Sequence, residues 1–385
     1  MLETFMKRLI NKLKSESNIV IVGAGKNGKE LLTRLIDEKI SVSRLMDNNR
    51  EIQGTEIDGV KVFPIEKLED NAMYLVSVGE KYRDEIVRQL LDMGVSEDKI
   101  VKCYLYREYE YMRNLPEKYY KDEVMEMYRE GIGKEMNYDN PQTYNEKISW
   151  EKLNIHDPMR TKCADKYLVR DYVKEKVGEE HLTKLYGVWD DANEIDFSLL
   201  PNSFVLKTNH GGGCNIVVKD KKDLNIKEAV VQLNKWKEIN FFYLALEWQY
   251  KNIPPKIICE EYLEGIADDV YDYQFYCFHG EPKYIWCING SHKENCKASF
   301  YNENWEMLPF AYGYPKDEIK APRPPHLKEM LNISKILCEP FSHVRVDMYD
   351  LPDGRVLVGE MTFTTWAGRH PFYPDEWDAV WGKLI

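Results

Sequence analysis

The feature that most constrains the fold is a β-hairpin near the C-terminus, residues 344–362. Asp353 and Gly354 form a tight-turn signal, and the residues on both sides of it alternate between apolar and polar. This alternation predicts two antiparallel strands with one apolar and one polar face. The outward side chains of such a hairpin lie at fixed spacing on a rigid surface, which suits a binding site.

The polar face of this hairpin carries two carboxylates, Asp347 and Glu360, and one guanidinium, Arg345. With the turn centred on residues 352–353, Asp347 is expected opposite Val358, with Glu360 as its diagonal neighbour on the same face. Two carboxylates held roughly 5–8 Å apart on rigid strands suit Mg²⁺ that carries phosphates. The alternative is a cross-strand salt bridge between Arg345 and Glu360 on a solvated face.

A second element, residues 204–220, is predicted to be a strand, a glycine-rich loop and a returning strand. Lys207 lies near the end of the first strand, and Gly211, Gly212 and Gly213 lie in the loop. Consecutive glycines let backbone N–H groups approach a polyphosphate closely. Because strands flank the loop on both sides, it is not a P-loop, which must open a helix. The pattern favours a flap over nucleotide phosphates, and an ordinary hairpin loop is the alternative.

A third element, residues 256–265, is an apolar strand that ends in Glu260 and Glu261, with Leu263 just beyond. Asp272 and a further hairpin follow it. Taken in this order, the three elements resemble the ATP-grasp superfamily of carboxylate–amine ligases.

The resemblance implies a role for each of these residues. Lys207 and the glycine loop would cover the ATP phosphates, and Arg345 would stabilise the transferring phosphoryl group. The implied adenine and ribose contacts are Glu260, Glu261, Leu263 and Asp272. The implied Mg²⁺ ligands are Asp347, Glu360 and Thr362, the last of which stands where the superfamily usually has asparagine.

More narrowly, residues 114–380 resemble the TupA-like branch of ATP-grasp proteins, named for teichuronopeptide biosynthesis. The branch implies ATP-dependent amide formation, through an acyl phosphate, between a uronic-acid sugar and an amino acid or amine in capsular or cell-surface polysaccharide biosynthesis. A glycosyltransferase-type polysaccharide protein and an ATP-grasp phosphotransferase are the alternatives. The segments that carry the resemblance are NPQTYNEKISW at 140–150, DKYLVRDYV at 165–173, FVLKTNHGGG at 204–213 and GEMTFT at 359–364.

Further candidates lie on either side of these motifs. ATP-grasp proteins use another lysine ahead of the glycine loop to reach the α- or β-phosphate. Lys166 is the candidate, with Lys162 second on the same predicted helix, and a solvated helical face is the alternative for both. Arg369 and His370 follow the acidic hairpin and are candidates for holding the carboxylate of the acceptor substrate. An exposed surface loop without a role in binding is the alternative, and it is slightly favoured. His210, inside the glycine loop, is expected to be exposed to solvent.

The first hundred residues alternate strand and helix, which predicts a parallel sheet with helices on both faces. Gly23, Gly25 and Gly28 fit G-x-G-x-x-G between a strand and a helix, and Asp47 closes the second strand about 20 residues later. This region resembles the small Rossmann-like domain of sugar N-acyltransferases, which implies nucleotide-sugar binding. Its short length makes NAD(P) redox chemistry less favoured, and a domain that binds nothing is the other alternative.

The expected organisation has three parts. Residues 1–106 form a Rossmann-like domain, residues 107–139 a helical connector, and residues 140–385 the ATP-grasp domain. The expected fold class is α/β and α+β, with a small parallel sheet followed by an ATP-grasp fold of antiparallel sheets and helices.

Charge and cysteine pattern exclude several classes of protein. The formal net charge of −12 argues against a nucleic-acid surface, which needs a basic stripe. The eight cysteines include no C-x-x-C pair, so reduced thiols are expected rather than disulfides or a zinc site. No apolar run approaches the roughly 18–20 residues of a membrane-spanning helix. We therefore expect a cytoplasmic protein.

The first residues form an apolar stripe at helical spacing with basic neighbours. A helix of this kind can rest on an anionic membrane surface; packing against its own domain or against another subunit is the alternative. The apolar members of the stripe are Leu2, Phe5, Met6, Leu9, Ile10 and Leu13.

Overall fold

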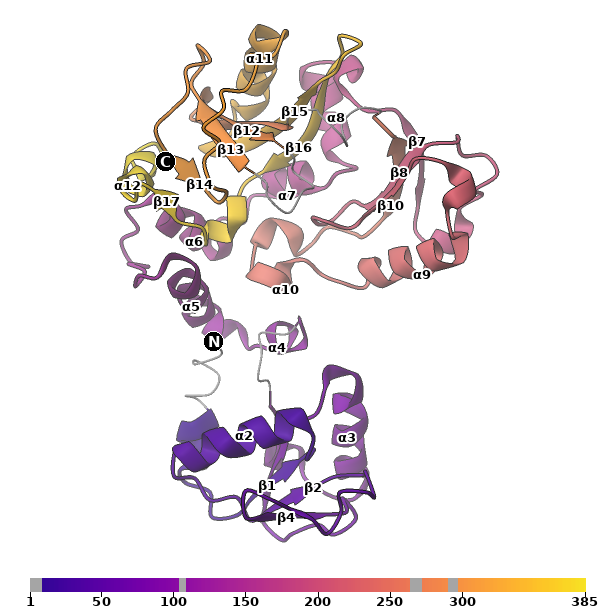
Figure 1. Cartoon of the computed structure of the whole chain (residues 1–385), viewed down its shortest axis with the longest axis vertical. Coiled ribbons are helices and arrows are strands. Elements are labelled where there is room, and N and C mark those ends of the chain that lie inside the picture. The colour runs from indigo at the N-terminus through magenta and orange to yellow at the C-terminus, as the bar shows by residue number, and fades with distance from the viewer. Residues whose placement is uncertain (1–8, 104–108, 264–271, 290–296) are drawn as a thin grey trace. The chain divides into compact units, whose positions relative to one another are not determined.

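The structure is a computed structural model that describes residues 9–103, 109–263, 272–289 and 297–385. The chain forms two compact units, residues 1–117 and 118–385. Figure 1 shows both units and labels most of their helices and strands. Within the described residues, no helix is both long enough and apolar enough to cross a bilayer.

The N-terminal unit is built on one sheet with the strand order β3-β4-β2-β1-β5-β6. Strands β4, β2, β1, β5 and β6 run parallel, and β3 adds an antiparallel edge. The strands are β1 (Ile19–Val22), β2 (Arg44–Met46), β3 (Glu56–Ile57), β4 (Val60–Phe63), β5 (Met73–Val76) and β6 (Ile100–Lys102). The helices are α2 (Lys26–Asp37), α3 (Glu80–Asp92) and α4 (Tyr109–Arg113).

Both faces of this sheet are covered because its central strands are apolar on both sides. Ile19 and Ile21 of β1 pack in one cluster with the buried leucines of α2. Val20 and Val22 pack in another cluster, which contains residues of α3. The parallel sheet with helices on both faces, predicted from the strand–helix alternation, is confirmed.

The predicted N-terminal helix is described only from Leu9 onward. Leu9 and Leu13 are buried, and Ile10 packs beside them, in the cluster that also holds α2 and β1. The remaining members of the apolar stripe, Leu2, Phe5 and Met6, lie outside the described residues. The described part of the stripe therefore packs against its own unit, as the alternative interpretation expects.

The C-terminal unit contains two antiparallel sheets, with the strand orders β7-β10-β8-β9 and β13-β12-β11-β15-β16. The smaller sheet is formed by β7 (Leu185–Trp189), β8 (Phe204–Thr208), β9 (Asn215–Val218) and β10 (Ile257–Glu261). The larger sheet is formed by β11 (Asp272–Phe278), β12 (Glu281–Asn289), β13 (Lys297–Tyr301), β15 (His343–Asp350) and β16 (Val356–Thr362). β14 (Ala311–Tyr312) pairs with β17 (Phe372–Tyr373). The predicted antiparallel sheets are thus confirmed.

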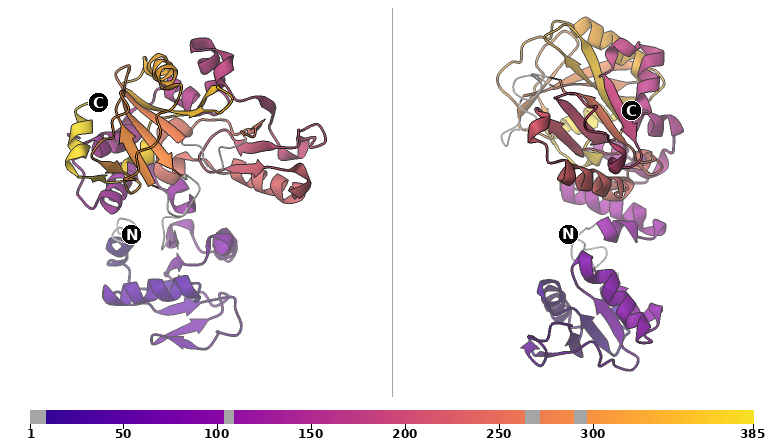
Figure 2. Two further views of the ribbon diagram at one scale, coloured as in Figure 1. Left: turned by 45° about the horizontal axis from the view of Figure 1, so that its top comes forward. Right: turned by 90° about the vertical axis from the view of Figure 1, so that its right-hand side faces the viewer.

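Helices of the C-terminal unit join and cover these sheets. Figures 1 and 2 show α9 with the smaller sheet, and α11 and α12 with the larger one. The helices are α5 (Tyr120–Ile132), α6 (Tyr144–Asn154), α7 (Pro158–Ala164), α8 (Val169–Lys176), α9 (Ile226–Lys237), α10 (Phe242–Ala245), α11 (Leu327–Cys338) and α12 (Glu376–Gly382). Short 3-10 turns of the chain are η1 (Glu97–Lys99), η2 (Glu117–Tyr119), η3 (Glu179–His181), η4 (Ala192–Glu194), η5 (Lys221–Asp223), η6 (Trp248–Tyr250) and η7 (Thr365–Gly368).

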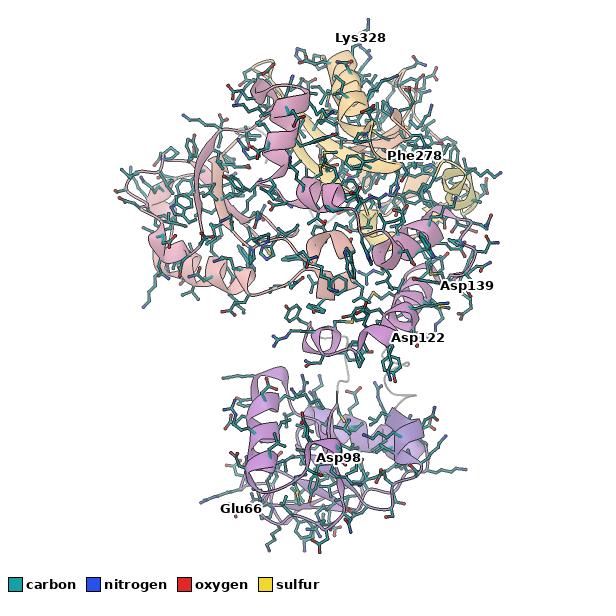
Figure 3. All side chains as sticks on the ribbon, turned by 180° about the vertical axis from the view of Figure 1, so that it is seen from behind. Glu66, Asp98, Asp122, Asp139, Phe278 and Lys328 are labelled. Atoms are coloured by element: carbon teal, nitrogen blue, oxygen red, sulfur yellow. The ribbon has the colours of Figure 1, made fainter. Side chains whose placement is uncertain are left out.

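The larger sheet buries both of its faces. Val344, Val346 and Met348 of β15 point into an aliphatic core that includes α8 and α11. Phe278, labelled in Figure 3, belongs to an aromatic cluster with Trp381 of α12, on the α6 and α12 side of the sheet. The strand alternation therefore sends the intervening polar residues of β15 away from the aliphatic core.

Gly28 has a packing role that a side chain would abolish. It lies in α2, and a Cβ added there would come within 1.7 Å of the carbonyl oxygen of Gly23. We expect Gly28→Ala to destabilise the unit by about 2 kcal/mol, because overpacking costs of about 1–3 kcal/mol exceed the gain in helix propensity of roughly 1 kcal/mol. Urea unfolding, followed by hydrogen exchange in β1 and β5, measures this loss. Gly25→Ala is the control because its added Cβ meets no atom within 4 Å, and equal stability of the two variants would contradict the prediction.

Candidate active site

The acidic hairpin forms as predicted, but its register differs. Asp347 lies directly opposite Glu360, and Met348 lies opposite Val358. The prediction that Asp347 faces Val358 is wrong for two reasons. Nearer the turn, the pairing is already one residue away from the expected register, with Met348 opposite Val358. A β-bulge between Asp347 and Met348 then adds a second residue and leaves Gly359 without a partner residue. The bulge brings the two carboxylates closer than a regular hairpin would.

A guanidinium joins these two carboxylates. Arg345 donates from Nε and Nη2 to the two oxygens of Asp347, at 2.7 and 2.6 Å, and from Nη2 to Oε1 of Glu360 at 3.1 Å. The Thr362 hydroxyl donates to the same oxygen of Glu360 at 3.1 Å. The structure thus contains the salt bridge that the sequence left open as an alternative, with all three predicted metal ligands on one face.

The two carboxylates have opposite electrostatic environments. Burial raises the pKa of Asp347, and the Arg345 guanidinium opposes this rise. Burial also acts to raise the pKa of Glu360, but the charges of Lys166 and Arg345 outweigh it and hold that pKa at about 2. Glu360 is therefore ionised at neutral pH, and 36% of its side chain is exposed to solvent.

Lys166 connects the hairpin to the glycine loop. Its Nζ lies 3.3 Å from Oε2 of Glu360 and donates a 2.8 Å hydrogen bond to the carbonyl oxygen of Gly211. Its backbone N–H also donates to the carbonyl oxygen of Asn209 at 2.9 Å. A single lysine thus contacts both elements that the sequence assigned to phosphate and metal binding.

The predicted single helix carrying Lys162 and Lys166 is wrong. Helix α7 ends at Ala164 and α8 begins at Val169, so Lys166 lies in the turn between them. The side chain of Asp165 makes this turn, because its Oδ1 accepts the backbone N–H groups of residues 167 and 168. Lys162 makes no hydrogen bond or ion pair with the part of the chain that the structure describes.

The glycine loop connects β8 and β9, and β10 runs beside β8. Lys207 of β8 lies 2.5 Å from Oε2 of Glu260 on β10. Arg170 of α8 lies 3.1 Å from the other oxygen, Oε1, of the same carboxylate. The structure therefore brings Lys207, the predicted phosphate lysine, and Glu260, a predicted adenine contact, into one ion-pair cluster.

The other predicted nucleotide contacts are Glu261, Leu263 and Asp272, and each has partners within the C-terminal unit. Glu261 pairs with Arg355 at 3.0 Å, and Leu263 is buried with Leu351 and Leu357. Asp272 begins β11 and accepts a 2.8 Å hydrogen bond from the Gln274 side chain. Strand β11 pairs with β15, which carries the acidic hairpin's Asp347.

Two loop residues that precede the glycines are structural. Asn209 is fully buried; its side chain donates to Asp165 at 2.9 Å and accepts from the Lys256 backbone at 2.6 Å. His210, expected to be exposed, is instead buried, with its Nε2 2.9 Å from the carbonyl oxygen of Ile239. Burial lowers the pKa of His210, which favours the neutral ring. The sequence could not reveal this, because the residues that cover the ring lie near Ile239.

The three glycines of the loop differ in their surroundings. A Cβ at Gly211 would lie 2.3 Å from the Phe241 ring, whereas one at Gly212 would meet no atom within 4 Å. Gly213 has a positive φ of 74°. Close packing at one end of the loop and open space at its tip agree with a loop fixed at its base.

Arg369 and His370 follow η7, near α5 and α6. The carbonyl oxygen of His370 accepts a 3.0 Å hydrogen bond from Asn145 of α6, and its ring lies against Trp366. Burial lowers the pKa of His370. A Cβ at Gly131 of α5 would lie 2.2 Å from the Arg369 carbonyl oxygen. Their contact with an acceptor stays a prediction.

A second candidate site lies in the N-terminal unit, at the carboxyl ends of β1 and β5. A cavity of about 400 Å³ there is lined by Gly23, Gly25 and Asp47 of the predicted nucleotide motif. Gly28 does not line it. Asp47 accepts backbone N–H groups with both carboxylate oxygens, from Ala24 at 2.7 Å and from residue 49 at 2.8 Å.

Ser77 also lines this cavity, although the sequence did not predict it as a site residue. Its side chain is 2% exposed, and its hydroxyl has no hydrogen-bond partner among the described residues. Ser77 directly follows β5, at the edge of a parallel sheet where ligands bind. Its position after an apolar strand is the only signal in the sequence.

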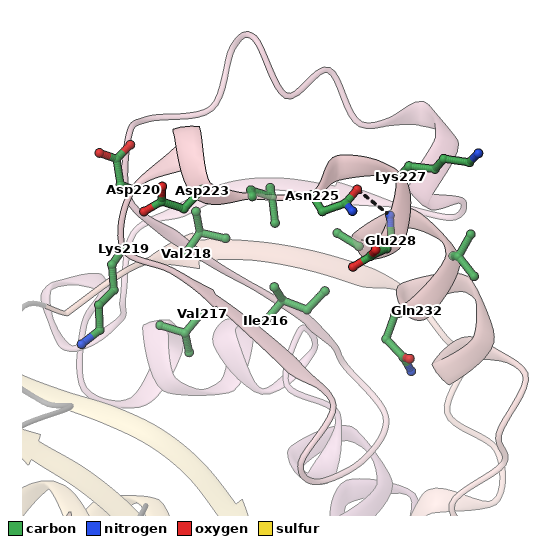
Figure 4. A pocket seen from close by; sticks show the side chains of 13 residues that line it. Ile216, Val217, Val218, Lys219, Asp220, Asp223, Asn225, Lys227, Glu228 and Gln232 are labelled. Atoms are coloured by element: carbon green, nitrogen blue, oxygen red, sulfur yellow. Dashed lines mark hydrogen bonds between the residues drawn. The ribbon is translucent and has the colours of Figure 1, made fainter.

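A hollow larger than this cavity lies elsewhere. It is an open hollow of about 1070 Å³ between β9 and α9, shown in Figure 4, with Val217 and Gln232 among its lining residues. None of the predicted site residues lines it. Size alone therefore does not identify the active site of this chain.

Comparison with protein families decides the family of this chain. The TupA-like ATP-grasp family model matches residues 146–385, which is more than half of the sequence. The chain belongs to the TupA-like ATP-grasp family. The match includes the glycine loop, β10 and the acidic hairpin, so the resemblance seen in the sequence is confirmed.

Solved structures of two ligases have low similarity to this chain. An L-amino acid ligase from Bacillus licheniformis is 13% identical, with a TM-score of 0.36, over 90% of this chain and 68% of the ligase. A D-alanine–D-alanine ligase from Bacillus anthracis, complexed with ATP, is 14% identical, with a TM-score of 0.32, over 90% of this chain and 85% of the ligase. The family assignment rests on the family model alone.

The N-terminal unit has relatives of its own. A model of C2185-like N-terminal domains matches residues 15–101. The redox-sensing transcriptional repressor Rex of Syntrophomonas wolfei subsp. wolfei is 43% identical over 54 residues, which are 14% of this chain and 26% of the repressor. The chain thus spans about a quarter of the length of the curated relative it matches.

We expect removal of the buried Arg345 to lower the free energy of unfolding more than removal of the more exposed Arg355. Arg345→Met leaves Asp347 buried without its partner, so we expect a loss of about 3–5 kcal/mol in the free energy of unfolding. Arg355→Met removes a pair in which 40% of the arginine side chain is exposed, so we expect a loss of about 0–1 kcal/mol. Urea unfolding of both variants measures the difference. Equal losses would contradict the structural role assigned to Arg345.

Proposed function

We propose that this TupA-like ATP-grasp protein is an ATP-dependent carboxylate–amine ligase. The observation that carries the proposal is the double contact of Lys166, which joins Glu360 of the acidic hairpin to Gly211 of the glycine loop. These are the two elements between which the phosphates of ATP would lie. Family membership supports the same activity.

The residues of the hairpin fit Mg²⁺ by their donor chemistry. Asp347, Glu360 and Thr362 offer only oxygen ligands on one face, and Mg²⁺ is commonly held by one or two carboxylates together with substrate phosphates. Within the described residues, no group of three or more His, Cys, Asp or Glu side chains could hold a metal by itself. The magnesium would supply charge neutralisation on the phosphates.

The nucleotide contacts follow the same arrangement. Lys166, Lys207 and the backbone of Gly211, Gly212 and Gly213 would neutralise the phosphates. The strand β10 would hold adenine through Glu260, Glu261 and Leu263, and Asp272 would bind ribose. The ion pairs between Lys207, Arg170 and Glu260 support this assignment, because they gather the cations at one end of β10.

The reaction requires positioned charges rather than a protein nucleophile. The substrate carboxylate attacks the γ-phosphorus of ATP, which forms an acyl phosphate and releases ADP. The amine then attacks the acyl carbon, and phosphate leaves as the amide forms. Arg345 would stabilise the transferring phosphoryl group, and Arg369 and His370 would hold the acceptor.

The substrate class that we propose is a uronic-acid sugar coupled to an amino acid or amine during cell-surface polysaccharide synthesis. The N-terminal cavity would bind the nucleotide of a nucleotide-linked sugar, with Gly23, Gly25 and Asp47 near its phosphates and ribose. Gly28 would act through close packing. The unpartnered Ser77 hydroxyl supports a ligand there, since buried polar groups normally have partners.

Two carboxylate variants test the proposed activity. We expect Asp347→Asn and Glu360→Gln each to reduce ATP turnover by about 100-fold or more, because each removes a negative charge that holds the magnesium nucleotide. The measurement is ADP release with ATP, UDP-glucuronate and a mixture of L-amino acids, with circular dichroism as the check on folding.

The matched control is Glu281→Gln, since Glu281 is an exposed carboxylate paired with Lys335 on the surface of the same sheet. Turnover that is unchanged in Asp347→Asn or Glu360→Gln would reduce the hairpin to a structural salt bridge. A phosphorylated sugar without amide would identify a phosphotransferase. Consumption of nucleotide-sugar with ATP untouched would identify a glycosyltransferase.

The N-terminal cavity predicts a separate binding effect. We expect Ser77→Ala to weaken the binding of UDP-glucuronate about three- to tenfold, which is the loss of one hydrogen bond. Isothermal titration calorimetry measures this change, with the exposed Ser15→Ala as control. Binding of NADH in place of UDP-glucuronate would instead support the dinucleotide alternative.

A further inference from the structure

A partly buried polar cluster lies directly after the acidic hairpin, and the proposed reaction gives it no role so far. Thr364 donates a hydrogen bond from its hydroxyl to Oε1 of Glu247 and accepts one from the Gln249 side chain at 2.6 Å. Thr364 follows the predicted metal ligand Thr362 by two residues, and Phe363 between them packs into the aliphatic core. Both threonines therefore turn away from that core.

The Glu247 carboxylate has an unused oxygen. Its Oε2 accepts no hydrogen bond from the residues that the structure describes, although its Oε1 is held by Thr364. The side chain is only partly buried. A carboxylate that is fixed at one oxygen and open at the other is arranged to receive a proton from a group outside the protein.

The charges around Glu247 offset only part of the effect of burial on its pKa. Burial raises the pKa of Glu247, while the Thr364 hydroxyl and the charges of Lys152 and Arg369 oppose the rise. Lys152 of α6 is fully buried, and its Nζ donates to the carbonyl oxygen of Ala367 at 3.2 Å. A carboxylate with a raised pKa is a better proton acceptor than an ordinary one.

The backbone beside the cluster is held in an uncommon conformation. Trp366 and Ala367 have positive φ values of 53° and 52°, and Gly368 follows with a φ of 67°. Strain of this kind in non-glycine residues costs of order 1–3 kcal/mol each and gathers at functional sites. Side chains of α6 hold the turn, because Lys152 and Ser149 donate to its carbonyl oxygens.

Tyr250 relates this cluster to the acidic hairpin. Burial raises the pKa of Tyr250, and the negative charges of Glu247 and Glu360 raise it further. The Tyr250 hydroxyl is therefore within electrostatic range of both carboxylates. Glu247 and Glu360 thus lie near the same partly buried tyrosine.

We propose that Glu247 is the general base for the amine, with Thr364 and Gln249 as the residues that position it. The inference rests on the ligase function proposed above. Oε2 of Glu247 takes one proton from the ammonium form of the amine, which frees the nitrogen lone pair to form the bond to the acyl carbon. The carbon–oxygen bond to phosphate breaks with its electron pair on phosphate, and the leaving phosphate takes the second proton from nitrogen.

Two nucleophiles separate this role from a structural one. The probes are UDP-glucuronate with ATP and either a mixture of L-amino acids or hydroxylamine. Hydroxylamine is largely unprotonated at neutral pH, so its attack depends little on a base. We expect Glu247→Gln to slow amide formation by about 100-fold, the usual contribution of a general base, and to slow hydroxamate formation much less.

Thr364→Val tests the positioning of the base. This change removes the hydroxyl but keeps the shape of the side chain, so we expect a smaller loss that again falls on amide formation alone. Glu281→Gln is the control and should leave both products unchanged. Thermal unfolding of all variants reports on the fold.

The possible outcomes discriminate between the two proposals. Equal losses with both nucleophiles in Glu247→Gln, or no loss with either, would overturn the role of Glu247 and leave the ligase function standing. A wild-type protein that releases no ADP with either nucleophile would overturn the ligase function and this inference together. A loss confined to the amino acids supports the base.

Discussion

The structure of the candidate site depends on the pairing of Arg345 with Asp347 and Glu360. Both carboxylates lie on one face of a bulged hairpin, and the guanidinium between them compensates charge that burial would otherwise make costly. Lys166 extends this network to the glycine loop. Without these cations, the facing carboxylates would repel each other, and β15 and β16 could not hold them at directly opposite positions.

The same network bears on the proposed binding of magnesium and ATP. Under that proposal, a divalent cation with phosphates would replace Arg345 as the compensating charge, which would free the guanidinium for the transferring phosphoryl group. Glu360 is already ionised, with a pKa of about 2, so magnesium binding would require no proton to leave it. Lys207 is likewise held by Glu260, and under the proposed function a phosphate would compete for it. The ion pairs hold these side chains in position.

The polar groups after the hairpin extend this arrangement toward the second half-reaction. Thr362 and Thr364 lie on either side of a buried phenylalanine, so one threonine faces the predicted metal ligands and the other holds Glu247. The left-handed turn that follows is fixed by α6. One short segment thus connects the residues of the proposed magnesium site with the carboxylate that we propose as the base.

The sequence by itself determined the alternation of strands and helices, the two antiparallel hairpins and the residue types of the candidate site, because local periodicity and turn signals encode these features. It could not determine the register of Asp347 against Glu360, since a bulge at Gly359 depends on cross-strand packing. It also could not place His210 in the interior or Lys166 against both Glu360 and Gly211, because the partners come from distant segments. Glu247 and Thr364 are 117 residues apart in the chain. Only tertiary folding brings such side chains together, because no local signal in the chain specifies a contact over that separation.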